Sequence, residues 1–124
     1  MNNLTVTKDP DGQSGILSIP LRSVDYLLCE SEKKRMLVYV GDVIYYMMGT
    51  VKYWETAIAN TGDYRFVKVD RNTLVNIVNI QILDTKYRKA YFGSNKKFGC
   101  EFAHHKFSEY EQIIKSFNKS VSVI

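Results

Sequence analysis

Short β-rich runs separated by turn residues dominate the first half of the chain, and they constrain its fold more than any other feature. Residues 24–29, 36–40 and 43–48 are mostly apolar or aromatic, and only a charged segment and the pair Gly41-Asp42 separate them. Two such runs around a short polar segment predict a β-hairpin, and the Gly-Asp pair predicts a second tight turn. We therefore expect three consecutive strands here.

The rest of the chain repeats this pattern and adds two helices. Further β-like runs span residues 16–20, 66–69, 74–77, 80–84, 90–92 and 97–102. Apolar residues at helical spacing predict a helix that Thr50 caps and Gly62 ends. The same spacing over residues 107–117 predicts a terminal helix, with Ser108 and Glu111 as a capping box. Because no βαβ alternation occurs, we expect a mostly β fold with two short helices and no parallel sheet.

The length of 124 residues and the 45% hydrophobic content allow one domain with its own core. Residues 1–15 are polar and lack periodicity, so we expect a loosely ordered arm before a domain over residues 16–124. No run approaches the roughly 20 apolar residues of a membrane span, and no secretory signal is visible. Cys29 and Cys100 are therefore expected as reduced thiols in a cytoplasmic protein without membrane insertion.

Charge is unevenly distributed along the chain. Residues 1–64 carry six Lys/Arg and eight Asp/Glu, whereas residues 65–124 carry eleven and five. A basic half beside an acidic half favours an anionic partner such as nucleic acid. The alternative is an ordinary soluble protein with a basic isoelectric point.

One segment has a recognisable pattern. Residues 66–76 read F-V-K-V-D-R-N-T-L-V-N, with Ile80 and Leu83 a few places on. This segment resembles the signature of LytTR-type DNA-binding domains, which commonly read F-x-R-x-H-R-S-x-[I/L]-V-N. Asp70 and Asn72 stand where histidine and serine are usual. Residues 19–30 and 50–55 are similar to the opening strands and the middle helix of that family, so the resemblance covers about residues 16–117.

The resemblance implies an elongated arrangement of small antiparallel sheets, with a middle helix and a C-terminal helix. It implies a sequence-specific transcriptional regulator that binds duplex DNA through loops, mainly in successive major grooves. Paired direct repeats, a dimer on DNA and DNA bending are expected by the same resemblance. Family members usually follow a receiver domain, for which this chain has no room, so it resembles a stand-alone member or a fragment of a longer one.

Basic turns supply the candidate DNA contacts. Lys33, Lys34 and Arg35 lie in the first hairpin turn, which reaches DNA in the family. An arginine there can bond guanine O6 and N7, whereas a lysine more often neutralises phosphate. Arg71 and Asn72 occupy a turn whose family equivalent touches the DNA backbone. The alternative for each is a solvated turn or, for Asn72, a local backbone bond.

Two further basic segments complete the candidate set. His104, His105 and Lys106 follow the last predicted strand, where the family places a basic residue in a major groove. His105 and Lys106 are the best matches, and a histidine there would make binding depend on pH. The alternative is a surface histidine pair that caps the loop before the helix. Lys86 and Arg88 form another basic turn, which suits phosphate contact and fits an ordinary surface hairpin turn equally well. The remaining candidates are Lys96 and Lys97, after a predicted hairpin turn at residues 93–95.

Other residues have structural interpretations. The carboxylate of Asp70 would repel phosphate, so we expect it to pair with Arg71 or Lys68. Asn76 is expected to close a turn. Trp54 and Phe117 are expected in the core.

Two rival functions remain open. The first is a protein-interaction module of LytTR-like fold that controls another regulator or is held by a membrane-bound inhibitor. The second is a small enzyme that uses Cys100 and His104, but no third orienting group is evident. The cysteines and histidines also lack the paired spacing of zinc ligands. We therefore predict no catalytic residue, no metal and no cofactor.

Overall fold

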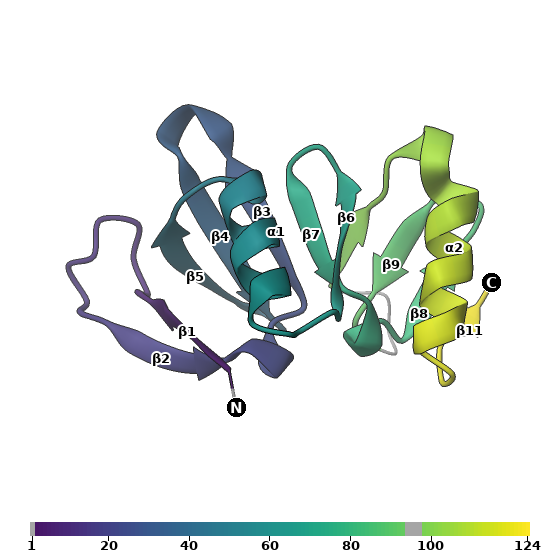
Figure 1. Ribbon diagram of the computed structural model, residues 1–124, viewed down its shortest axis with the longest axis horizontal. Coiled ribbons are helices and arrows are strands. Elements are labelled where there is room, and N and C mark those ends of the chain that lie inside the picture. Colours follow the sequence, from purple (N-terminus) through teal and green to yellow (C-terminus); the bar gives the residue numbers. More distant parts are fainter. Residues whose placement is uncertain (1, 94–97) are drawn as a thin grey trace.

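The computed structural model describes residues 2–93 and 98–124, which form three β-sheets and two α-helices. The sheets follow one another along the long axis of the molecule (Figure 1). This arrangement confirms the mostly β fold that the sequence predicts. Of the turn predicted at residues 93–95, only Gly93 is described, and the candidates Lys96 and Lys97 also lie outside the described residues.

The first sheet joins the N-terminal segment to the rest of the domain. Strand β1 (Asn3–Val6) pairs antiparallel with β2 (Leu17–Pro20). The side chains of Leu4 and Val6 are buried in the first hydrophobic core. Residues 3–6 are therefore not the loosely ordered arm that the sequence predicts. A strand of four residues is too short to produce a visible hydrophobic period, and ten residues separate it from its partner β2.

The central sheet has the strand order β5-β4-β3-β7-β6, and all of its pairs are antiparallel. Its strands are β3 (Tyr26–Glu30), β4 (Arg35–Val40), β5 (Val43–Met48), β6 (Phe66–Asp70) and β7 (Thr73–Asn76). The three consecutive strands predicted from the first half of the chain are confirmed. Pairing of β3 with β7 then places the turn between β6 and β7 beside the first hairpin.

Helix α1 (Val51–Asn60) covers one face of the central sheet (Figure 1). The Thr50 hydroxyl accepts a hydrogen bond from the Tyr53 amide at 3.1 Å, which confirms the predicted cap. Val51 and Ile58 are buried against the sheet. Trp54 is half-buried against this core, and its indole Nε1 donates to the Met48 carbonyl at 2.8 Å.

The third sheet has the order β10-β9-β8-β11. It contains β8 (Ile82–Asp84), β9 (Lys89–Tyr91), β10 (Gly99–Glu101) and β11 (Ser122–Val123). The pair β8–β11 is parallel, contrary to the expectation that parallel pairing is absent. The sequence did not reveal β11 because a strand of two exposed residues has no pattern, and α2 supplies the crossover that parallel strands require.

Helix α2 (Phe107–Phe117) begins two residues earlier than the capping-box prediction, because its N-cap is Lys106 and not Ser108. It continues directly from the 3₁₀ helix η4 (His104–Lys106), so Ser108 lies inside the helix and no side chain caps it. Glu111 instead pairs with Lys115 at 2.6 Å. The last apolar residue of the predicted stripe, Phe117, is 67% exposed, so its expected place in the core is wrong.

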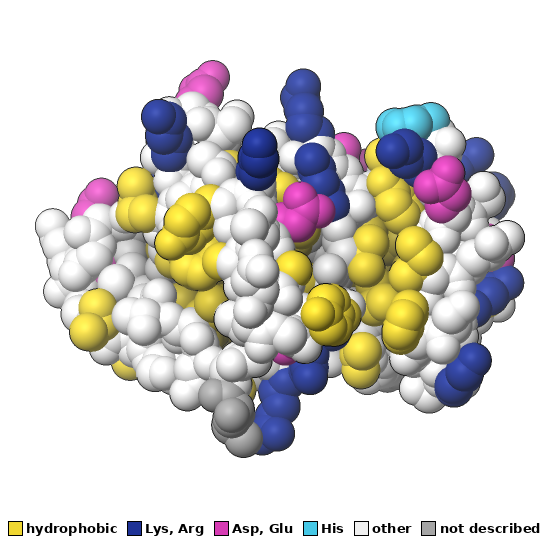
Figure 2. All heavy atoms as spheres, viewed as in Figure 1, with side chains coloured by type: hydrophobic (Ala, Val, Ile, Leu, Met, Phe, Trp, Pro, Cys, Tyr) yellow, Lys and Arg dark blue, Asp and Glu magenta, His cyan; other side chains and the backbone are white. Residues whose placement is uncertain are grey.

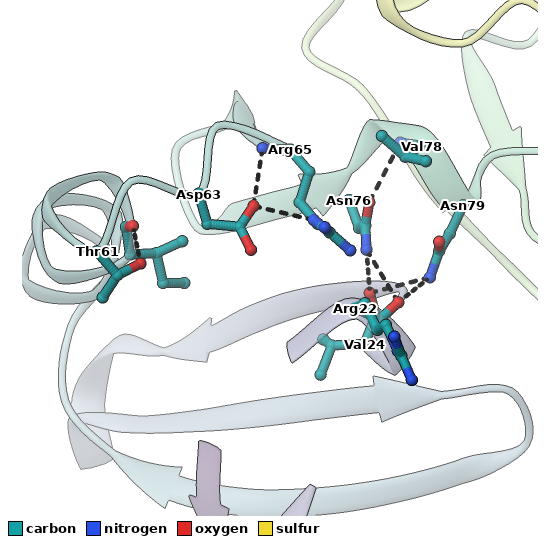
Figure 3. A network of polar contacts seen from close by, with 9 residues as sticks. Arg22, Val24, Thr61, Asp63, Arg65, Asn76, Val78 and Asn79 are labelled. Atoms are coloured by element: carbon teal, nitrogen blue, oxygen red, sulfur yellow. Dashed lines mark hydrogen bonds and ion pairs between the residues drawn. The ribbon is translucent and has the colours of Figure 1, made fainter. Parts of the chain in front are cut away.

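Asn76 closes a turn at the end of β7, as predicted, and also bonds the segment that precedes β3. It is fully buried, and its Nδ2 donates to the Val24 carbonyl at 3.0 Å. Its Oδ1 accepts from the Val78 amide at 3.2 Å, which closes the 3₁₀ helix η3 (Ile77–Asn79) (Figure 3). Among the described residues, no helix is long and apolar enough to cross a bilayer.

Candidate nucleic-acid interface

Three of the basic turns lie along one edge of the molecule, the upper edge in Figure 1. They are the turn between β3 and β4, the turn between β6 and β7, and the η4 segment that precedes α2. Figure 2 shows Lys, Arg and His side chains gathered along this edge. We call these three segments the basic edge, defined as residues 31–35, 70–72 and 104–106.

Backbone hydrogen bonds hold the basic edge together. The Cys29 amide donates to the Asn72 carbonyl at 2.8 Å, which joins the middle turn to the strand that leads into the first turn. The Ala103 amide donates to the Val69 carbonyl at 2.8 Å, which joins the η4 segment to the middle turn. Because these bonds join backbone atoms and not side chains, the three segments keep a fixed order: first turn, middle turn, η4.

In the first turn, two lysines are free to reach a ligand. Lys33 and Lys34 are exposed, and neither makes an ion pair with another described residue. Lys34 adopts a left-handed backbone conformation with φ 50° and ψ 44°. This conformation closes the 3₁₀ helix η2 (Ser31–Lys33), since the Lys34 amide donates to the Ser31 carbonyl.

Arg35 occupies a different environment from its lysine neighbours. Its Nη2 and Nε lie 2.8 Å and 3.0 Å from Oε1 of Glu30, and its side chain is only 15% exposed. The guanidinium carbon also lies 5.7 Å from the centre of the Tyr46 ring. Arg35 is therefore held by an ion pair and an aromatic face where β4 leaves the first turn.

The middle turn presents Arg71 to solvent, whereas Asn72 is half-buried. The adjacent Asp70 is exposed, and its Oδ1 accepts a hydrogen bond from the Arg71 amide at 2.7 Å. Within the described residues, Asp70 makes no ion pair with Arg71 or Lys68. The expected pairing is therefore replaced by a bond to the backbone, which leaves a negative charge at the surface of the basic edge.

The η4 segment exposes His104, His105 and Lys106 together. Two buried aromatic residues anchor it on either side: Phe102 before it and Phe107 after it, with ring centroids 5.8 Å apart. The segment therefore has an apolar base and a polar outer surface.

The turn between β8 and β9 is attached near the same end of the molecule. The Phe102 amide donates to the Arg88 carbonyl at 2.9 Å, so this turn lies beside the strand that leads into η4. Lys86 is exposed and its ammonium lies 5.3 Å from the centre of the Tyr87 ring. Arg88 is half-buried and has a positive φ of 53°. Of this pair, only Lys86 is exposed.

Lys52 and Lys68 were missing from the sequence-based candidates. Both are exposed, and Lys52 lies in the first turn of α1, where it faces the positive end of the helix dipole. A cation in the first turn of a helix is unfavourable unless an anion binds nearby. This position in the sequence is the signal that could have identified Lys52. The Gly49 amide donates to the Lys34 carbonyl at 2.8 Å, which brings the start of α1 to the first basic turn.

Gly49 is essential to that approach. Its φ is +132°, and a Cβ at this position would overlap the Nε1 and Cδ1 atoms of Trp54. Only glycine therefore allows the chain to pass from β5 into α1 while Trp54 keeps its bond to Met48.

The residues of the rival enzyme and metal sites are poorly suited to those functions. Burial raises the pKa of the Cys100 thiol well above its usual range, which disfavours the reactive thiolate. His104 lies in the exposed η4 segment. Among the described residues, no group of three His, Cys, Asp or Glu side chains could hold a metal ion.

A mostly β domain whose basic loops share one edge has the charge pattern that is typical of nucleic-acid-binding domains. The family model of the LytTr DNA-binding domain matches residues 14–115, and the chain therefore belongs to the LytTR family. Members of this DNA-binding family act in transcription regulation.

The fold comparison agrees. The LytTr DNA-binding domain of a Bacillus cereus protein described as a methyl-accepting/DNA response regulator superposes with a TM-score of 0.68 and 14% sequence identity. The match covers 94% of this chain and 99% of that chain, and at this identity it supports the fold alone. No curated protein sequence matches the chain significantly.

Proposed function

We propose that this domain is a sequence-specific regulator that reads two successive major grooves of duplex DNA with the two ends of the basic edge. The observation that carries the proposal is the fixed order of the three basic segments along one edge. The first turn and η4 lie at its ends, and the middle turn lies between them. Two grooves on one side of B-DNA are separated by a phosphate ridge, and this arrangement matches that order.

In this proposal, Lys33 and Lys34 enter one groove and His105 and Lys106 enter the other. Lys33, Lys34 and Lys106 neutralise phosphates at the groove rims, and His105 donates to a base edge. Arg71 and Asn72 contact the phosphates between the grooves. Lys86, Arg88 and His104 lie at the end of this surface, where they contribute attraction to the flanking DNA.

Arg35 has a positioning role in this proposal. A base contact would require its guanidinium to leave Glu30 and the Tyr46 ring, and it would lose two short charge-assisted contacts. We therefore assign base or phosphate contact in the first turn to Lys34, and assign to Arg35 the support of the hairpin that carries it.

We further propose that two copies bind paired repeats. A single copy with three short basic segments can contact only about two grooves, which limits both affinity and specificity. Two copies on adjacent sites would increase both the affinity and the specificity of binding.

The test is a selection of bound duplexes from a random DNA pool, repeated at about 50 and 200 mM salt. The wild-type protein should enrich a repeated motif at both concentrations. The variants Lys34→Asn and His105→Ala should change the preference at separate bases. Lys8→Asn, in the N-terminal loop away from the basic edge, is the matched control and should retain the motif.

Two results would contradict the proposal. Binding without a motif that disappears at the higher salt concentration would indicate phosphate attraction alone. Loss of preference at the same bases in both variants would mean that the two loops do not read separate grooves.

A further inference from the structure

The edge opposite the basic edge carries a groove, away from the proposed DNA contacts. The loop between α1 and β6, the η3 segment and the end of α2 meet there, at the lower edge of Figure 1. The groove has a volume of about 410 Å³. We call it the lower groove and define it by five of its lining residues: Asp63, Tyr64, Arg65, Val78 and Phe117.

Three large apolar side chains border the lower groove and are exposed to water. Tyr64 is 75% exposed, Phe117 67% and Val78 49%. They come from three different elements of the fold, so one mobile loop does not account for them. Exposed apolar side chains that cluster around a concave surface are typical of protein-interaction sites.

Buried amides hold two of these side chains in place. The Nδ2 of Asn118 donates to the Ile77 and Ile80 carbonyls at 2.9 and 2.6 Å, which ties the end of α2 to η3. Asn118 is 5% exposed and directly follows Phe117. The Asn76 Oδ1 binds the Val78 amide from the other side (Figure 3). Phe117 and Val78 therefore project from a rigid backbone, which lowers the entropy cost of binding a partner.

The groove also contains a polar group, the guanidinium of Arg65. The Asp63 carboxylate accepts from the Arg65 Nε at 2.9 Å and from the Arg65 amide at 3.2 Å (Figure 3). The side chain of Asp63 is 10% exposed, whereas that of Arg65 is 32% exposed. The Asp63 carboxylate therefore orients the guanidinium, and the Nη atoms remain able to bind a second carboxylate.

The surroundings of the groove are basic. Arg22 and Lys119 are exposed beside elements that line it: the Arg22 carbonyl accepts from Asn79 of η3, and Lys119 follows the end of α2. Figure 2 shows hydrophobic surface in the lower half of this face, bordered by Lys and Arg side chains. An apolar groove with a basic border complements a segment that combines acidic and large apolar residues.

We propose that the lower groove docks an acidic peptide segment of a partner protein. An aromatic or aliphatic side chain of that segment packs between Tyr64 and Phe117, and one of its carboxylates binds the Nη atoms of Arg65. Because the groove and the basic edge lie on opposite edges, the domain can hold DNA and this partner at the same time. The docking of the peptide does not depend on the sequence specificity proposed above.

The test begins with two displayed libraries of short peptides. One library combines Asp and Glu with Leu, Phe and Trp, and the other replaces the acidic residues by Lys and Arg. Enriched peptides are labelled with fluorescein, and their affinity for the full chain is measured by fluorescence anisotropy. We expect enrichment from the acidic library only, with dissociation constants of about 1–100 μM, as is typical of small docking surfaces.

Matched variants locate the binding surface. Tyr64→Ser and Phe117→Ser remove exposed side chains and should leave the urea unfolding midpoint unchanged. Each should weaken the peptide at least about ten-fold, equivalent to about 1.4 kcal/mol. Tyr87→Ser is the control, because Tyr87 is similarly exposed, at 59%, but lies in the turn between β8 and β9. It should bind the peptide as the wild type does.

Competition with a duplex separates this site from the basic edge. An acidic peptide held at the lower groove should remain bound when a saturating duplex is added. Displacement by the duplex, or loss of binding in Lys34→Asn, would show that the peptide binds the basic edge and would overturn the proposal. The proposal would also be overturned if no peptide is enriched, if basic peptides are enriched, or if Phe117→Ser binds the peptide as tightly as the wild type does. If Phe117→Ser instead converts a dimer to a monomer in sedimentation, a second copy occupies the groove and the acidic-peptide assignment is wrong.

Discussion

The Ala103 amide donates a hydrogen bond to the Val69 carbonyl at 2.8 Å, and this contact joins two basic segments that are more than thirty residues apart in the chain. Val69 precedes the middle turn and is fully buried, while Ala103 precedes η4. The bond therefore sets the position of His105 relative to Arg71. It lies at the junction between the central and third sheets, so the spacing of the proposed contacts depends on how these sheets are joined.

The first prediction concerns Lys34. Replacement by Asn removes the charge but tolerates the left-handed conformation at this position, where φ is 50°. We expect DNA affinity to fall several-fold and the slope of log K against log salt to decrease by about one, the effect of one lost phosphate contact. Titrations at several salt concentrations measure both quantities. Equal effects from Lys8→Asn would contradict a specific role for the first turn.

The second prediction concerns Asp70, whose exposed carboxylate lies within the basic edge. Asp70→Asn keeps an oxygen that can accept from the Arg71 amide but removes the negative charge. We expect DNA to bind a few-fold more tightly, because repulsion between the carboxylate and phosphate is lost. Asp11→Asn, in the exposed N-terminal loop, should change affinity little. An unchanged or weaker affinity for Asp70→Asn would place Asp70 outside the DNA contact.

The third prediction concerns Asn118, which is buried and bonds the carbonyls of Ile77 and Ile80. Asn118→Ala leaves buried carbonyls without donors, and we expect it to lower the free energy of unfolding by about 2–3 kcal/mol. Urea denaturation measures this change. Asn60→Ala, which removes an exposed amide at the end of α1, should cost less than about 1 kcal/mol. Similar losses in both variants would show that the buried amide has no special role.

The fourth prediction concerns the pH dependence of stability. Burial raises the pKa of Asp25, and hydrogen bonds from the Gly41 amide and Asn79 only partly oppose this rise. Between the ordinary and the raised pKa, the folded protein therefore binds more protons than the unfolded chain, and its stability falls as pH increases. We expect Asp25→Asn to lack this decrease.

Urea denaturation across the acidic range, compared with Asp42→Asn as an exposed control in the neighbouring turn, measures the difference. Below the ordinary pKa of an aspartate, the curves of wild type and Asp25→Asn should run parallel. If they run parallel throughout, then ionisation of Asp25 costs the folded state nothing.

Several elements were predictable because their signals are local. The strands of the first hairpin and helix α1 depend on short-range alternation, helical spacing and the Thr50 cap, and all of them are present as expected. The capping box at Ser108 was wrong because a 3₁₀ helix leads straight into α2 and removes the need for a side-chain cap. The burial of β1 was missed because its partner and its core neighbours lie elsewhere in the chain.

In the candidate site, too, local sequence signals predict some features and miss others. Basic residues in turns are visible in the sequence, and so are the segments that contain them. The ion pair of Arg35 with Glu30 is not visible in the sequence, although the two residues are close together in it. Strand register decides whether their side chains meet. The approach of Lys52 to the first basic turn was also not predictable, because it depends on the bond between Gly49 and Lys34.

The sequence by itself determined the family, the β-rich class and the basic character of the turns, because residue type and spacing act over a few neighbouring positions. Only the tertiary structure decided that residues 31–35, 70–72 and 104–106 share one edge and that Tyr64, Val78 and Phe117 surround a groove on the other. These arrangements depend on pairing of distant strands and on buried amides such as Asn76 and Asn118. Such contacts form only when the whole chain is folded, because each joins segments that are separated by tens of residues.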